Sequence, residues 1–88
     1  MNLRLAISEQ PLILILMVLL MNQELKFSTI KITTGLTVEE TRHGIKQLIK
    51  EGLIEKITRS SLNPTFRMIN QNIAKSYLEN IAKRRILH

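Results

Sequence analysis

The hydrophobic and polar positions divide the chain into five segments, beginning with a strongly apolar one. Ten apolar residues in a row occupy Leu12–Met21, and the polar residues around them predict a first helix over 8–22. Ser8 is suited to be its N-cap, with Glu9 and Pro11 in the first turn. A helix that is apolar on every side must be covered on every side. We therefore expect a second subunit to cover part of it.

Residues Leu25–Thr34 have a less definite pattern. They are rich in β-branched residues, whose low helix propensity favours a strand. The apolar residues do not alternate regularly with the polar ones, however, which argues against a strand. Ser28 offers an N-cap and Gly35 a left-handed C-terminal residue for a short helix over 28–35. Both interpretations stay open.

The clearest helical pattern covers 37–51. Thr37 and Glu40 have the spacing of a capping box, and Gly52 ends the helix. The residues expected on its inner side are Val38, Thr41, Ile45, Leu48 and Ile49. The residues expected on its outer side are Glu39, Arg42, His43, Lys46 and Lys50. Gly44 in the middle costs about 1 kcal/mol relative to Ala, so we expect another helix to cross closely there.

Residues 53–70 change to short extended segments. Leu53–Arg59 and Thr65–Asn70 flank a tip that is rich in Ser, Asn and Pro, which is typical of a β-hairpin. Arg59 and Arg67 would place cations near the end of the hairpin that extends furthest into solvent.

A last helix is predicted over 71–87, with Asn70 as its N-cap. Its apolar stripe is broad, and a domain of 88 residues has a thin stability margin. We therefore expect this stripe to form a homodimer interface, with contacts inside one chain as the alternative. The expected interface residues are Ile73, Tyr77, Leu78, Ile81 and Ala82.

Charge narrows the choice of partner. The formal net charge is +6, and the excess lies from residue 42 onward, where ten cations accompany three anions. Such a balance favours an acidic partner. Aromatic residues make up only 3% of the chain, too few for the stacking surfaces that bind RNA or single strands. Double-stranded DNA is the expected partner.

The sequence gives little support for an enzyme, a metal-binding protein or a membrane protein. The chain has no cysteine, which excludes disulfides, thiolate zinc sites and a cysteine nucleophile. His43 and His88 lack the neighbours of a catalytic triad, and the glycines are scattered. We expect no enzyme, cofactor or metal. The apolar run is too short to span a bilayer and lacks the flanks of a secretory signal, so we expect a cytoplasmic protein without a membrane partner.

The order of helix, helix, helix, hairpin and helix resembles winged helix-turn-helix proteins, a mainly α fold with a small β-hairpin. The Gly35–Thr37 turn and the Gly52–Ile54 exit, with the spacing between them, are similar to the recognition-helix region of MarR-like regulators. Small archaeal viral, plasmid and phage regulators share this pattern. The resemblance covers about 25–70, and it implies a DNA-binding protein that uses the third helix in the major groove and the wing on the backbone or minor groove.

The resemblance also implies which residues contact DNA. On the third helix these are Val38, Glu39, Arg42, His43 and Lys46, with Lys50 suited to a phosphate. On the wing they are Arg59, Ser60, Ser61 and Asn63, together with the cation Arg67. Arg42 suits a bidentate contact to guanine. An ordinary solvated helix face is the alternative for the same charges.

Three features depart from the MarR pattern. Lys31 stands where the family keeps a small apolar residue, and Glu39 and Glu40 place negative charge at the end expected to enter DNA. The long N-terminal dimerisation helix is absent as well.

The expected function is that of a dimeric transcriptional regulator on a pseudo-palindromic site. One alternative is a plasmid or viral partition adaptor that binds repeated sites with a second protein. The other is a protein-interaction winged helix, which the acidic Glu39 and Glu40 favour.

Overall fold

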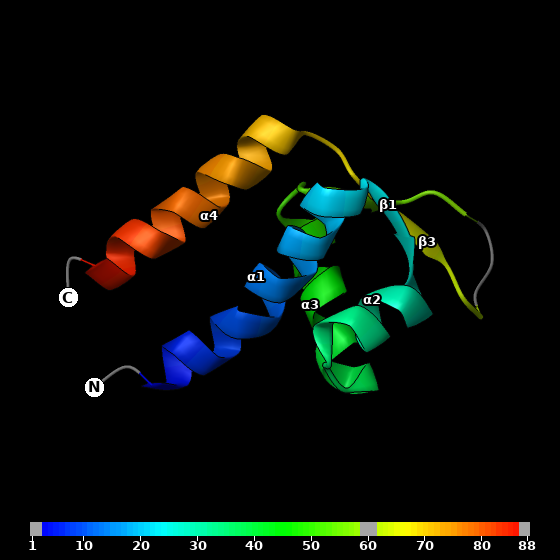
Figure 1. Ribbon diagram of the computed structural model, residues 1–88, viewed down its shortest axis with the longest axis horizontal. Coiled ribbons are helices and arrows are strands. Elements are labelled where there is room, and N and C mark those ends of the chain that lie inside the picture. Colours follow the sequence, from blue (N-terminus) through cyan, green and yellow to red (C-terminus); the bar gives the residue numbers. More distant parts are fainter. Residues whose placement is uncertain (1–2, 59–61, 87–88) are drawn as a thin grey trace.

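Four helices and a small antiparallel sheet make up the described part of the chain (Figure 1). The computed structural model describes the backbone of residues 3–58 and 62–86, and the side chains of 10–58 and 62–83. In chain order the elements are α1 (Leu3–Asn22), β1 (Glu24–Lys26), α2 (Phe27–Thr34), α3 (Val38–Lys50), β2 (Ile54–Lys56), β3 (Thr65–Met68) and α4 (Gln71–Ile86). The first turns of α1 and the last turns of α4 project to the same side (Figure 1), which helps to make the molecule 42 Å long and only 20 Å thick.

Helix α1 begins at Leu3, earlier than the sequence predicts. Ser8 therefore lies inside the helix, and its assignment as the N-cap was wrong. Pro11 is an interior residue, although its ring removes one backbone donor from the helix. Pro is favoured near helix starts only as a tendency, so Pro11 does not fix where α1 begins.

The hydrophobic core is built around the second half of α1. Ile15, Leu16 and Leu19 have no solvent exposure, and they pack with the buried residues of α2, α3 and the sheet. The other buried apolar residues are Ile30, Ile45, Leu48, Leu53, Ile54, Phe66, Met68, Ala74 and Ile81. Every other element thus contributes to one core centred on α1.

Helices α1 and α3 cross at Gly44, as the sequence predicts. A Cβ atom built on Gly44 would lie 2.6 Å from Cδ1 of Ile15, 3.7 Å from Cβ of Pro11 and 3.8 Å from Cδ2 of Leu12. The first distance is shorter than van der Waals contact, so the glycine allows the two helices to approach. This close approach of α1 and α3 explains why glycine, a poor helix former, occupies the middle of α3.

The segment 25–34 contains both structures that the sequence left open. Its beginning belongs to strand β1, and the rest forms α2. Gly35 ends the helix in the left-handed conformation, with φ of 74° and its N–H donating to the Lys31 carbonyl. Ser28 is not the N-cap, because α2 already begins at Phe27.

The predicted hairpin is present and has a third strand beside it. Strands β2 and β3 pair antiparallel, with Ile54 opposite Met68. Strand β1 pairs with the other edge of β3, with Leu25 opposite Phe66. The sequence did not predict β1 as a sheet strand, because three residues are too few for a visible alternation.

The predicted helix caps are confirmed for α3 and α4. The Thr37 N–H donates to Oε1 of Glu40 at 2.9 Å, and the Glu40 N–H donates to Oγ1 of Thr37 at 3.1 Å. Oδ1 of Asn70 accepts from the backbone N–H groups of Asn72 and Ile73 at 2.9 and 3.1 Å. These bonds satisfy donors that have no partner inside the helix.

The inner side of α3 is narrower than expected. Thr41, Ile45 and Leu48 are buried, as predicted. Val38 and Ile49, which were expected to face inward, are exposed. Both lie at the margin of the buried stripe, where the 3.6-residue period turns side chains away from α1.

The close crossing predicts that Gly44→Val destabilises the fold. The branched side chain would displace Ile15 and Leu12 in a filled core, at a cost of about 1–3 kcal/mol. Lys50→Val on the exposed side of the same helix is the control, with an expected change within about 0.5 kcal/mol. Urea unfolding measures both. Equal stabilities of the two variants would refute the close packing at Gly44.

Candidate nucleic-acid interface

The outward side of α3 carries the polar residues expected there. Glu39, Arg42, His43, Lys46 and Lys50 are all exposed. The opposite side of the helix is fixed by buried contacts and by the hydroxyl of Thr41, which donates to the Thr37 carbonyl at 2.8 Å. The charged side chains therefore extend from a rigid, capped helix.

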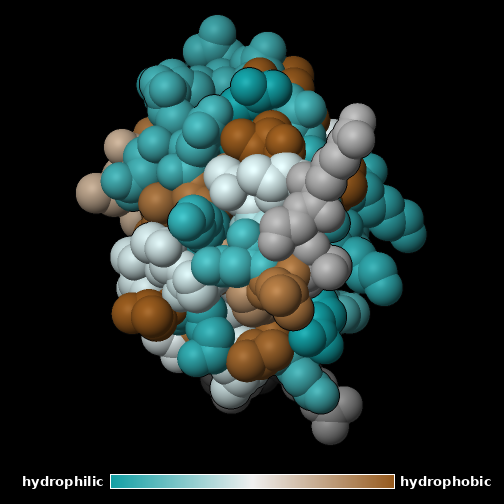
Figure 2. Space-filling view, turned by 90° about the vertical axis from the view of Figure 1, so that its right-hand side faces the viewer, coloured by the Kyte–Doolittle hydropathy of each residue, from teal (hydrophilic) through white to brown (hydrophobic). Residues whose placement is uncertain are grey.

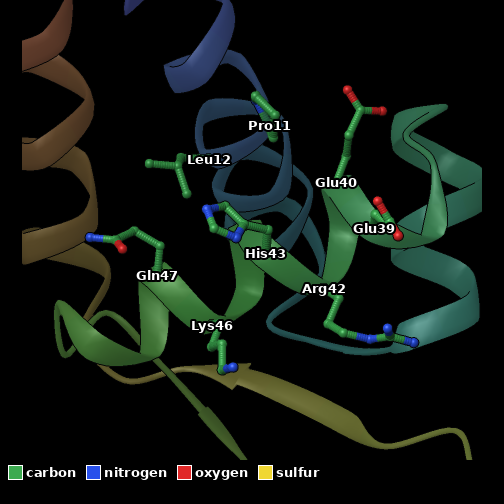
Figure 3. A pocket seen from close by; sticks show the side chains of 9 residues that line it. Pro11, Leu12, Glu39, Glu40, Arg42, His43, Lys46 and Gln47 are labelled. Carbon is green, nitrogen blue, oxygen red and sulfur yellow. The ribbon is translucent and has the colours of Figure 1, made fainter.

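A groove of about 670 Å³ follows this side of α3. Pro11 and Leu12 of α1 form one wall, while the other wall consists of the exposed residues of α3 (Figure 3). His43 lies toward Leu12, whereas Arg42 and Lys46 point away from α1 (Figure 3). The groove is thus apolar where it adjoins α1 and charged along α3.

The charges of α3 are sorted along its length. Glu39 and Glu40 are in the first turn, and Lys50 is in the last. This order complements the helix dipole, and Glu40 is also engaged in the capping box. The free cations of α3 consequently lie beyond its first turn, from Arg42 to Lys50.

Three cations of α3 have no protein partner. Within the described residues, Arg42, Lys46 and Lys50 form no ion pair or hydrogen bond through their side chains. Nearby Glu51 accepts instead from Nε2 of Gln47 at 3.1 Å. The cations of α3 therefore remain available to an external anion.

Arg67, expected among the DNA contacts of the wing, is paired with the protein itself. Its guanidinium lies 3.0 Å from Oε2 of Glu55, and Glu24 is opposite it on β1. Such a half-exposed pair contributes little stability, but Glu55 offsets the charge of Arg67, and Glu24 adds a further negative charge opposite it. The outer face of the sheet is consequently a weak site for phosphate.

Asn63, another expected DNA contact, connects the wing to α2. Its Oδ1 accepts from the Ser28 N–H at 3.1 Å, and its Nδ2 donates to Oγ of Ser28 at 3.1 Å. The neighbouring Pro64 carbonyl accepts from the Phe27 N–H at 2.8 Å. Asn63 thus caps α2 from a distant part of the sequence, which explains why α2 needs no local capping side chain.

The remaining wing residues of the expected interface are Arg59, Ser60 and Ser61, and they lie outside the described residues. Two exposed lysines at the tip end of the sheet were missed by the sequence analysis. Lys26 is opposite Thr65, and Lys56 is opposite Phe66. Their positions depend on strand register, which the sequence pattern leaves undefined for such short strands.

The apolar stripe of α4 is used largely inside the chain. Ile81 is buried, and Tyr77 and Leu78 pack half-buried against the core. Ile73 and Ala82 are exposed, but nine residues separate them, which places them on opposite sides of a helix. The five residues that were expected at a dimer interface therefore do not form one exposed face. Tyr77, Leu78 and Ile81 make contacts inside their own chain instead.

The described residues form neither a metal-binding cluster nor a membrane-spanning helix. No group of three His, Asp or Glu side chains there is arranged to hold a metal ion. None of the described helices combines the length and the hydropathy that crossing a bilayer requires. Comparison with known proteins adds no assignment, since no protein-family model and no curated protein matches this chain.

Asn63→Ala is expected to loosen the wing from α2. Loss of the cap should reduce the free energy of unfolding by about 0.5–2 kcal/mol. Leu62→Ala is a suitable control, because this neighbouring side chain is 95% exposed and should change stability by less than about 0.5 kcal/mol. Chemical denaturation compares the two. If both variants are as stable as the original chain, the Asn63 cap does not stabilise the fold.

Proposed function

We propose that this protein is a winged helix-turn-helix DNA-binding protein, acting as a dimeric transcriptional regulator. One observation carries the proposal: the three unpaired cations of α3, Arg42, Lys46 and Lys50, extend from a helix whose other side is fixed in the core. The order of the elements and the three-stranded sheet are compatible with a winged helix.

In this proposal α3 enters the major groove. Arg42 reads a base, since its guanidinium fits the two acceptors of guanine. Lys46 and Lys50 contact phosphates, which fixes the position of the helix on the duplex. His43 and Val38 complete the surface that approaches the base edges. Glu39 suits only a donor such as the amino group of cytosine.

The wing then follows the DNA backbone or the minor groove. Lys26 and Lys56 supply charge at its tip end, where both side chains are exposed. In this proposal Arg67 contributes less to the contact than these lysines, because it is paired with Glu55. Asn63 acts by positioning the tip through Ser28.

A protein-interaction module is the second candidate function. The described face of α3 is formally balanced, since Glu39, Glu40 and Glu51 oppose its three cations. A partner with both signs of charge would fit such a face. Absence of any complex with duplex DNA at low salt would favour this candidate. A partition adaptor, which would add a second protein, is distinguished by a long cooperative footprint instead of one short site.

Arg42→Ala should reduce affinity for the preferred sequence and relax discrimination at one base pair. Loss of one bidentate contact corresponds to about 1–3 kcal/mol. Arg67→Ala is the matched control, since it removes the same formal charge from a side chain that is already paired. Fluorescence anisotropy with duplexes selected from a random pool measures both variants. Equal losses would contradict the assignment of Arg42 as the base reader.

Binding should also depend steeply on salt. Two protomers that together contact about six to ten phosphates lose affinity by roughly a thousandfold or more between 50 and 200 mM salt, because bound counterions are released. The slope of the logarithm of affinity against the logarithm of salt concentration gives the number of contacts. A nearly flat slope would mean that phosphates do not dominate binding.

A further inference from the structure

One face of α1 is apolar and is only partly covered by the described residues of its own chain. Met17 is 48% exposed and Met21 is 80% exposed. Ile13 and Leu14 are half-buried, and neither is among the residues that pack against the described core. Residues 13, 17 and 21 follow one another at intervals of four, with residue 14 beside them, so they form one stripe along the helix. We call these four residues the α1 stripe.

The stripe differs from the exposed apolar residues Ile32 and Leu62. The wing end of the molecule is mainly hydrophilic, with separate hydrophobic spots (Figure 2). Ile32 on α2 and Leu62 between β2 and β3 are exposed in separate parts of the fold, which is usual for a protein surface. Four apolar side chains in one row are more typical of an interaction site.

Charge favours a second copy of this chain as the occupant. Each chain carries a formal net charge of +6, and a symmetric dimer places each surface patch against itself. Like charges would therefore meet across an interface at the tip end of the sheet, where Lys26 and Lys56 are exposed. Residues 10–23 contain no charged residue at all, so α1 offers a neutral face on which two such chains can meet. The same neutrality gives an anionic membrane or a charged protein nothing complementary to attract.

We propose that two copies associate through the α1 stripe, with Met17 at the centre of the contact. The proposal specifies the dimer of the proposed function. It places the contact on α1 instead of on α4, where Ile81 is buried in its own chain. It does not depend on DNA binding. The apolar character of α1 on all sides then has one explanation, since its inner side forms the core and its outer side forms the dimer.

The test is the mass of the full chain in solution without DNA. Sedimentation equilibrium at micromolar concentrations should give twice 10.2 kDa for the original sequence. Met17→Glu should raise the dissociation constant of the dimer by about a hundredfold or more, because it places two uncompensated carboxylates in an apolar contact. Ile32→Glu is the matched control, with the same charge change at an apolar residue that is 76% exposed, and it should remain dimeric.

Circular dichroism confirms that each variant keeps its helices. If Met17→Glu does not fold, Met21→Glu replaces it, since that side chain is the more exposed and its substitution disturbs the core less. A monomeric original chain, a dimeric Met21→Glu variant, or equal dissociation of Ile32→Glu would overturn the proposal. So would binding of the monomer to neutral phosphatidylcholine vesicles, which would assign the stripe to a membrane surface.

The same variants separate this proposal from the proposed function. A monomeric Met17→Glu chain that still binds a half-site duplex weakly supports both. If Met17→Glu is monomeric and neither the original chain nor the variant binds DNA, the dimer proposal is supported and the proposed DNA-binding function is contradicted.

Discussion

The structure depends on the close crossing of α1 and α3 at Gly44. The absence of a side chain at this position brings the two helices together, and Ile15 fills the contact from α1. Because α3 is seated there, Thr41, Ile45 and Leu48 turn inward and the charged residues turn outward. The helix dipole and the capping box then determine how those charges are ordered along α3. The candidate interface is therefore a consequence of core packing.

Helix α1 combines two tasks in one hydrophobic segment. The side that faces α3 and the sheet supplies the centre of the core, and the opposite side carries the proposed α1 stripe. A chain of 88 residues buries a smaller fraction of its surface on folding than a larger protein does. Association of two copies would cover apolar surface that folding leaves exposed. The wing is attached to this body by Asn63, which caps α2 through the Ser28 N–H. The base of the wing is consequently held against α2.

The sequence predicted the features that depend on local chemistry. The capping box of Thr37 and Glu40, the cap at Asn70, the glycine at the helix crossing and the exposed cations of α3 all follow from residue types at characteristic spacings. Features that depend on distant contacts were not predictable. Pairing of Arg67 with Glu55 requires the register of β2 and β3, and the role of Asn63 requires knowing that the wing lies against α2. Periodicity likewise predicts an apolar stripe on α4 without showing which of its residues, such as Ile81, the chain itself buries.

The central claim is that the exposed side of α3 is the surface that meets duplex DNA. An NMR titration of the ¹⁵N-labelled chain with a duplex at low salt tests it most directly. The account predicts that the largest amide shifts occur between Val38 and Lys50, with smaller shifts at the tip end of the sheet. Saturating DNA that shifts the amides of α1 or α4 while those of α3 stay unchanged would contradict it.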